Sequence, residues 1–154
     1  MRTRLFTLAA LAVATTLAQH AAAAELIGTV KRVVDGDTIV VTAKGFDTTV
    51  RLLAIDTPET KKPGTVVQCG GPAATAETKR VLSADIKVRV MSDPNPKYET
   101  RDRYGRFLGY VYLKGRSGES GSVGYQLVAR GFARVLVVNR RRPPTYATAF
   151  RTAE

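Results

Sequence analysis

The chain has 154 residues, and its 24 Lys and Arg against 13 Asp and Glu give a formal net charge of +11 at pH 7. One cysteine, Cys69, excludes an internal disulfide, and Cys69 with the single histidine, His20, is too few for a zinc site built from these residue types. His20 lies in the N-terminal segment, so the remainder of the chain has no histidine for a Ser–His or Cys–His nucleophile pair. Catalytic chemistry there must come from carboxylates, Arg, Lys and Tyr, with or without a hard cation.

The N-terminal segment has the pattern of a secretion signal. Arg2 and Arg4 precede a mostly apolar run, residues 5–18, and several alanines follow it. The run is shorter than the ~20 residues needed to span a bilayer, and no later stretch is long enough. We therefore expect a signal peptide over residues 1–24, removed to leave a secreted or periplasmic domain over residues 25–154 with no stable membrane insertion. The alternative is a retained N-terminal anchor.

The mature domain stays strongly basic, and its size is that of one domain with a single modest core. A basic surface favours polyanionic partners, because each bound phosphate releases condensed counterions. Nucleic acid, anionic lipid and cell-wall polymer all fit this charge, so the charge does not select among them.

Three short alternating apolar runs begin the mature chain, and turn residues separate them. The runs cover residues 26–34, 38–43 and 48–55, with Asp35-Gly36 and residues 44–47 as the turns. Three strands joined by tight turns predict a meander bent into a small barrel.

Helices and strands alternate in the second half. Pro72 suits a first helical position and opens a predicted helix over residues 73–83. The pattern then predicts strands over 86–91 and 106–113 and a helix over 123–130 that ends at a left-handed glycine cap.

A last helix is expected near the C-terminus. Thr145 is its predicted N-cap, and Tyr146 and Phe150 are one turn apart on one face. The helix stops at Glu154 without a cap or a closing apolar residue, which indicates a truncated C-terminal helix. Five strands and two to three helices predict an α+β fold, mainly a five-stranded β-barrel of the oligonucleotide-binding (OB) type.

Two acidic segments stand at predicted strand ends. Asp35-Gly36-Asp37-Thr38 joins the first two strands, and Asp56-Thr57-Pro58-Glu59 follows the third, which also carries Arg51. Each segment has a structural interpretation, as an Asp-Gly turn and as a strand closed by a Thr-Pro turn with solvated charges. Their occurrence together favours a shared site.

The pleat of a strand imposes a condition on that site. Strict alternation places Arg51, Leu53 and Ile55 on one face of the third strand and Asp56 on the other. We therefore expect a bend or bulge near Ile55 if Arg51 and Asp56 are to face one phosphate.

Phosphodiester hydrolysis would use these residue types. Calcium prefers oxygen ligands, which Asp37, Asp56 and the Thr57 carbonyl would supply, and the cation would polarise a phosphoryl oxygen. Glu59, close to the metal, would take a proton from the attacking water. The guanidinium of Arg51 suits phosphoryl oxygens because it donates paired hydrogen bonds and stays charged.

A third segment, residues 102–112, contributes a second arginine. Arg106 opens a strand directly after a turn, where its side chain would project into a cleft, and Arg103 and Tyr104 would bind a neighbouring phosphate. The alternative is an exposed hairpin with a solvated charge run.

These three segments, in this order, resemble the signature of the staphylococcal nuclease (thermonuclease) family, and the similarity runs from about residue 26 to residue 138. The resemblance implies a five-stranded OB-type barrel with three helices, calcium as the cofactor, and an endonuclease that cuts DNA and RNA to leave 3′-phosphate ends. The implied roles are calcium binding by Asp37, Asp56 and the Thr57 carbonyl with Asp35 in support, binding of the scissile phosphate by Arg51 and Arg106, general-base catalysis by Glu59, and binding of a terminal phosphate by Arg103 and Tyr104.

The sequence departs from the family in two places. Val137 and Asn139 stand where the family has base-packing tyrosines, so nucleotide affinity and base preference are not carried over. Cys69 is outside the family's catalytic pattern, and we expect a buried or merely tolerated thiol, with a reactive thiol as the alternative.

The leading hypothesis is a monomeric nuclease whose partners are its DNA and RNA substrates. Two rival functions stay open. One is a non-catalytic binding module on the same barrel, and the other is binding of lipid or wall polymer through residues 140–142, where a solvated basic turn is the simpler interpretation.

Overall fold

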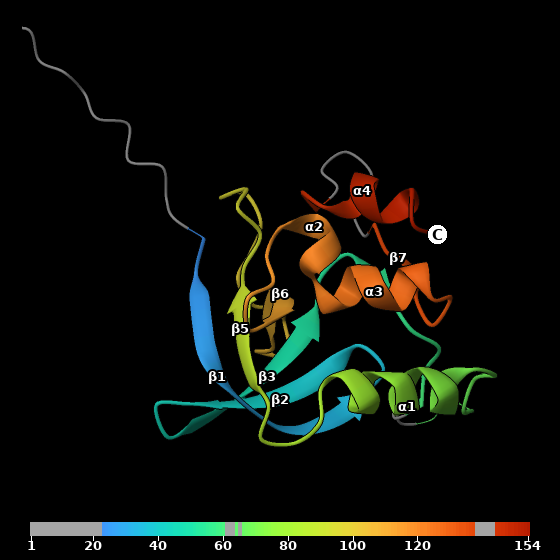
Figure 1. Cartoon of the computed structure of the whole chain (residues 1–154), viewed down its shortest axis with the longest axis horizontal. Coiled ribbons are helices and arrows are strands. Elements are labelled where there is room, and N and C mark those ends of the chain that lie inside the picture. The colour runs from blue at the N-terminus through green and yellow to red at the C-terminus, as the bar shows by residue number, and fades with distance from the viewer. Residues whose placement is uncertain (1–22, 61–63, 65, 138–143) are drawn as a thin grey trace, which may run out of the picture.

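The structure, a computed structural model, describes residues 23–60, 64, 66–137 and 144–154 (Figure 1). Nearly all of the predicted signal peptide lies outside the described residues, as do Asn139 and the basic run over residues 140–142. Within the described ranges, no helix combines the length and apolar character needed to cross a bilayer.

Five strands form a closed barrel, which confirms the predicted fold class. Their order around the barrel is β1-β2-β3-β6-β5. Their bounds are Glu25–Asp35 for β1, Thr38–Ala43 for β2, Phe46–Leu52 for β3, Lys87–Met91 for β5 and Phe107–Leu113 for β6. The first three strands form the predicted antiparallel meander, and the parallel pairing of β3 with β6 completes the ring.

Strand β1 closes the barrel because it pairs with two neighbours in turn. Its first half is antiparallel to β5 and its second half is antiparallel to β2. Register shifts between Val30 and Arg32 and between Val33 and Asp35 interrupt the second pairing. Such bulges bend a strand. Strand β1 therefore curves around the barrel, and Asp35 lies at one end of the barrel.

Apolar side chains from all five strands fill the barrel. Val30, Ile39, Val50, Val90 and Val111 have no exposed surface. Burying such side chains stabilises the fold by roughly 1.5–3 kcal/mol each. This rigid interior fixes the strand ends on which the polar residues sit.

The end predicted for the third strand, residue 55, was wrong, because the chain leaves the barrel before that residue. Strand β3 ends at Leu52, Ala54 takes a left-handed backbone conformation with φ of 63°, and β4 (Ile55–Asp56) pairs with β7 (Arg134–Val135) in a second small sheet. The bend that the pleat requires near Ile55 is therefore present. The apolar pattern concealed it because residues on both sides of the bend are buried.

Four helices cover the barrel within the described residues: α1 (Gly71–Val81), α2 (Gly118–Gly121), α3 (Val123–Ala129) and α4 (Ala147–Arg151). Helix α1 contacts β1, and α3 contacts β6 (Figure 1). Gly131, with φ of 75°, follows α3 in the predicted left-handed conformation. Helix α2 is a single turn that the sequence pattern did not reveal.

Thr145 was wrongly predicted as the cap of the last helix. The N-cap of α4 is Tyr146, which makes no side-chain cap hydrogen bond. The Thr145 backbone N–H instead donates to the buried carboxylate of Asp93 at 2.8 Å. The predicted pairing of Tyr146 with Phe150 is confirmed, since their ring centroids are 6.5 Å apart and Phe150 is fully buried.

Candidate active site

A cavity of about 650 Å³ opens where β1 and β3 end, where β2 begins and where the chain leaves the barrel. Eight of the nine side chains predicted for the site line it, namely Asp35, Asp37, Arg51, Asp56, Thr57, Glu59, Tyr104 and Arg106. We call this cavity the cleft. Only Arg103 of the predicted set is absent from its lining.

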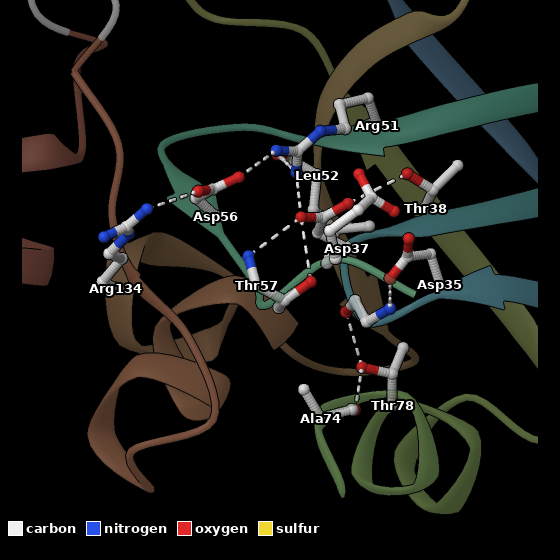
Figure 2. Close-up of polar contacts among 12 residues, drawn as sticks. Asp35, Asp37, Thr38, Arg51, Leu52, Asp56, Thr57, Ala74, Thr78 and Arg134 are labelled. Atoms are coloured by element: carbon white, nitrogen blue, oxygen red, sulfur yellow. Dashed lines mark hydrogen bonds and ion pairs between the residues drawn. The ribbon is translucent and has the colours of Figure 1, made fainter. Parts of the chain in front are cut away.

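Two carboxylates from distant segments meet at one guanidinium in the cleft. Arg51 Nη1 lies 2.8 Å from Asp37 Oδ2, and Arg51 Nη2 lies 3.1 Å from Asp56 Oδ1 (Figure 2). The Asp37 side chain is 9% exposed and that of Arg51 is 14% exposed, so their ion pair is largely withdrawn from water. Asp37 and Asp56 therefore face the same cationic centre.

Asp37 is held rigidly from several directions. Its Oδ2 accepts hydrogen bonds from the Thr57 backbone N–H and hydroxyl, both at 3.0 Å, and its Oδ1 accepts one from the Thr38 hydroxyl at 3.0 Å. The backbone register explains its position beside Arg51, because Thr38 of β2 pairs directly with Arg51 of β3. Hydrogen bonds to a charged acceptor are stronger than neutral ones, so they fix the carboxylate orientation.

The turn before Asp37 requires glycine at position 36. A Cβ atom on Gly36 would lie 2.7 Å from the Thr57 hydroxyl oxygen, closer than van der Waals contact permits. The Gly36 carbonyl also accepts a hydrogen bond of 2.6 Å from the Thr78 hydroxyl of α1 (Figure 2). Glycine thus lets the β1–β2 turn pack between Thr57 and α1.

Asp35 and Glu59 form a second carboxyl pair in the cleft. Burial raises the pKa of Asp35 to about 6, and a side-chain hydrogen bond with Glu59 and the negative charge of Asp37 act in the same direction. The Glu59 backbone is anchored to Gln68, with its N–H donating to Gln68 Oε1 at 2.9 Å and its carbonyl accepting from Gln68 N at 2.9 Å. Glu59, the predicted base, therefore lies on a loop that hydrogen bonds to Gln68 hold in place, next to the Asp35 carboxyl, whose pKa is raised.

Arg106 is fixed from the opposite side of the cleft by Asp102. Its Nε donates to Asp102 Oδ2 at 2.7 Å, and its backbone N–H donates to Asp102 Oδ1 at 3.0 Å. Burial alone would raise the pKa of Asp102, but the hydrogen bonds from Arg106 and Tyr104 bring it below the usual value. Neither terminal nitrogen of Arg106 has a hydrogen-bond acceptor among the described residues, so both are available to a phosphate.

Arg103 and Tyr104 lie at the edge of this arrangement. The Arg103 guanidinium carbon is 4.9 Å from the centre of the Tyr104 ring, and Arg103 Nη2 donates to the Tyr104 hydroxyl at 2.7 Å. The Arg106 guanidinium carbon is 5.4 Å from the same ring centre. Tyr104 is 67% exposed, so this pair presents a cation and an aromatic face to solvent beside Arg106.

Residues 49–154 match the family described as "Staphylococcal nuclease homologue". The chain belongs to the staphylococcal nuclease family.

Three relatives illustrate this membership. A thermonuclease from Staphylococcus intermedius is 51% identical over 84 residues, which cover 54% of this chain and 47% of that protein. The Bacillus subtilis (strain 168) proteins named SPbeta prophage-derived endonuclease YokF and endonuclease YncB are 46% and 43% identical over 110 residues, 71% of this chain. The match covers 34% of YokF and 48% of YncB, so the chain spans half or less of the length of these relatives.

The sequence did not reveal two residues that hold the site of this staphylococcal nuclease family member together. Arg134 Nη2 lies 3.2 Å from Asp56 Oδ2, because the β4–β7 pairing sets Arg134 directly opposite Asp56. Only the tertiary fold joins these residues. For Asp102 the sequence contains a local signal, since it precedes Arg106 by four residues across a turn.

The departures from the family also have structural positions. Val137 is half-buried and packs against the core, while Asn139 lies outside the described residues. Cys69 is exposed, so of the two expected cases, a buried or a merely tolerated thiol, the buried one is wrong. Cys69 lines a hollow of about 370 Å³ together with Asp56.

The donor set in the cleft suits a hard cation. Among the residues that the structure describes, no group of three or more His, Cys, Asp or Glu side chains gathers as a metal site. The candidate ligands are instead two carboxylates, Asp37 and Asp56, that already converge on one positive group, with Thr57 between them in space. Oxygen donors without sulfur or imidazole favour Ca²⁺ or Mg²⁺ over softer metals.

Proposed function

We propose that the chain is an exported, monomeric, calcium-dependent endonuclease that hydrolyses phosphodiester bonds of DNA and RNA and leaves 3′-phosphate ends. The observation that carries the proposal is the meeting of Asp37, Arg51 and Asp56 in a cleft that Glu59 and Arg106 also line. Carboxylate and guanidinium groups there surround one cavity that is large enough for a phosphodiester. The relatives named thermonuclease and endonuclease support the same reaction.

Asp37, Asp56 and the Thr57 carbonyl would hold the calcium ion. When bound, calcium polarises a phosphoryl oxygen and offsets the negative charge that develops on the phosphate. The hydrogen bonds from Thr57 and Thr38 fix the Asp37 carboxylate before any ligand arrives. Such preorganisation means that little reorganisation is needed on binding.

Glu59 would act as the general base. Its carboxylate removes a proton from a water molecule, the water oxygen bonds to phosphorus, and the bond from phosphorus to the 5′ oxygen breaks. The products are a 3′-phosphate and a 5′-hydroxyl, whose oxygen takes a proton from solvent. Asp35, which lines the same cleft, would lie near the metal ligands in support.

The two arginines would bind the phosphoryl oxygens. Asp102 accepts a hydrogen bond from Arg106 Nε, which leaves both terminal nitrogens for the phosphate. The planar guanidinium would therefore be oriented before the substrate binds. Arg51 stays charged beside Asp37 and Asp56 and presents its remaining N–H groups to the same space. Arg103 and Tyr104 would contact the next phosphate along the strand.

A cleavage assay tests this function. Purified protein is incubated with single-stranded DNA or RNA in calcium, and we expect short fragments that stop accumulating when a chelator is added. The fragments should carry 5′-hydroxyl ends that polynucleotide kinase labels without prior phosphatase treatment. Binding without cleavage in calcium would instead support the non-catalytic module.

Export and oligomeric state are separate parts of the proposal. The N-terminal residue of protein recovered from the periplasm or medium should be Glu25, and light scattering should give the mass of one chain. Cell-associated protein that retains its first 24 residues would indicate an anchor.

A further inference from the structure

A second hollow of about 660 Å³ lies between the end of β1 and helix α1. We call it the α1 groove. Val34 lines both the α1 groove and the cleft, and Thr60, which lines the groove, directly follows Glu59. A strand of polymer leaving the cleft on this side would therefore enter the α1 groove.

Two exposed cations border the α1 groove. Arg32 of β1 and Lys79 of α1 are exposed, and neither makes an ion pair or a side-chain hydrogen bond with any part of the chain that the structure describes. Their sequence neighbours differ, because Lys31 pairs with Asp47 at 2.6 Å and Arg80 pairs with Glu77 at 2.7 Å. Among the described residues, Arg32 and Lys79 thus make no ion pair and both line the groove, where they can contact an anionic ligand.

The lining between these cations is apolar with a few hydroxyls. Val67, which is 53% exposed, lies in it together with Pro72 and Ala76. The lining residues Thr60 and Thr75 each bury a hydroxyl oxygen that has no hydrogen-bond partner within the described segments.

We propose that the α1 groove is a subsite for the flanking part of a single nucleic-acid strand whose scissile phosphate lies in the cleft. Arg32 and Lys79 bind its phosphates, and the apolar lining packs against its sugars and bases. This inference rests on the proposed function and adds a substrate-length requirement to it. Cations that follow a backbone beside apolar contact surface are the usual means of binding single strands without sequence preference.

The test compares a short and a long substrate. The Arg32→Ala/Lys79→Ala double variant is assayed against a dinucleotide, which occupies only the cleft, and a single-stranded dodecamer, which reaches the groove. We expect the dinucleotide kcat/KM to stay within twofold of the parent and the dodecamer kcat/KM to fall at least about tenfold, chiefly through KM. The slope of log kcat/KM against log salt should become shallower by about 1.4 for two lost single-strand phosphate contacts.

A charge-matched control separates the groove from net charge. Lys97→Ala/Arg151→Ala removes two exposed cations that line neither the α1 groove nor the cleft, and should leave both substrates at the parental rate. The subsite is refuted if the Arg32→Ala/Lys79→Ala variant cleaves the dodecamer with parental kcat/KM and salt slope. Equal loss on both substrates with an unchanged melting temperature would also overturn it. A parent that cuts neither substrate would refute the proposed function itself.

Discussion

Replacing Arg106 with alanine removes a guanidinium from the lining of the cleft. In the folded protein its Nε is held by Asp102 at 2.7 Å, so the proposed binding of a phosphate would need little reorientation of the group. Loss of one such preorganised donor costs about 10²–10³ in kcat, or about 2.7–4 kcal/mol of transition-state stabilisation. We expect Arg106→Ala to lower kcat by at least ~100-fold.

The same substitution should leave the fold intact. Asp102 keeps its hydrogen bonds from the backbone N–H groups of Tyr104, at 2.9 Å, and residue 106, at 3.0 Å, because alanine retains the backbone. The lost ion pair is partly exposed, with 30% of the Arg106 side chain accessible. Its contribution to the free energy of unfolding is therefore expected to be below about 1 kcal/mol.

Two further variants make the assay specific. Arg106→Lys keeps the charge but loses the planar fork, and its kcat should lie between those of the parent and the alanine variant. Arg101→Ala removes a guanidinium that donates to the Gly105 carbonyl of the same turn and does not line the cleft, so it should cleave like the parent. Steady-state cleavage of single-stranded DNA in saturating calcium, with urea unfolding alongside, gives all the values. Turnover by Arg106→Ala within threefold of the parent would refute a phosphate-binding role for this residue.

Three other substitutions test separate parts of the structure. Glu59→Gln should lower kcat by at least ~100-fold but change calcium affinity by no more than about threefold, because it removes the base and not a metal ligand. Cleavage kinetics and calorimetric titration measure the two quantities. Parental turnover would exclude Glu59 as the base. Asp37→Asn should weaken calcium binding by at least about tenfold and reduce the rise in melting temperature that calcium gives the parent; an unchanged calcium affinity would contradict the proposed ligand set. Hydrogen bonds from Arg80 and then Arg130 lower the pKa of Glu77 to about 2, so its stabilisation is present above the unfolded value of 4.5 and is lost as pH falls towards 2. Glu77→Gln should accordingly lower the free energy of unfolding by about 1 kcal/mol at pH 7, with the difference from the parent shrinking towards pH 2 in urea titrations; a difference independent of pH would show that ionisation of Glu77 is not its source.

The sequence predicted most of the barrel because its signals are local. These signals are the alternation of apolar residues, the Asp-Gly and Lys-Gly turns and the glycine after α3. Each can be read from residues only a few positions apart. They gave four of the five barrel strands to within two residues at each end. The third strand failed at its end because alternation reports burial, and residues 53–55 are buried on both sides of a bend.

The candidate site was predicted in composition but not in arrangement. The pleat showed that Arg51 and Asp56 could face one ligand only if the strand bent near Ile55. The left-handed conformation of Ala54 supplies that bend and brings Arg51 Nη2 to 3.1 Å from Asp56. No local pattern specifies such a conformation for alanine, which is normally disfavoured there.

The amino-acid sequence by itself determined which chemical groups are available: oxygen ligands and guanidinium groups, with a single imidazole at His20 and no internal disulfide. It also determined the tight turns that carry Asp37 and Arg106. The tertiary structure alone decided that Arg134 meets Asp56 across 78 positions of chain and that Arg32 and Lys79 line one groove. Contacts of that kind depend on how the closed barrel directs distant segments to one edge, and that path is set by the packing of the whole core.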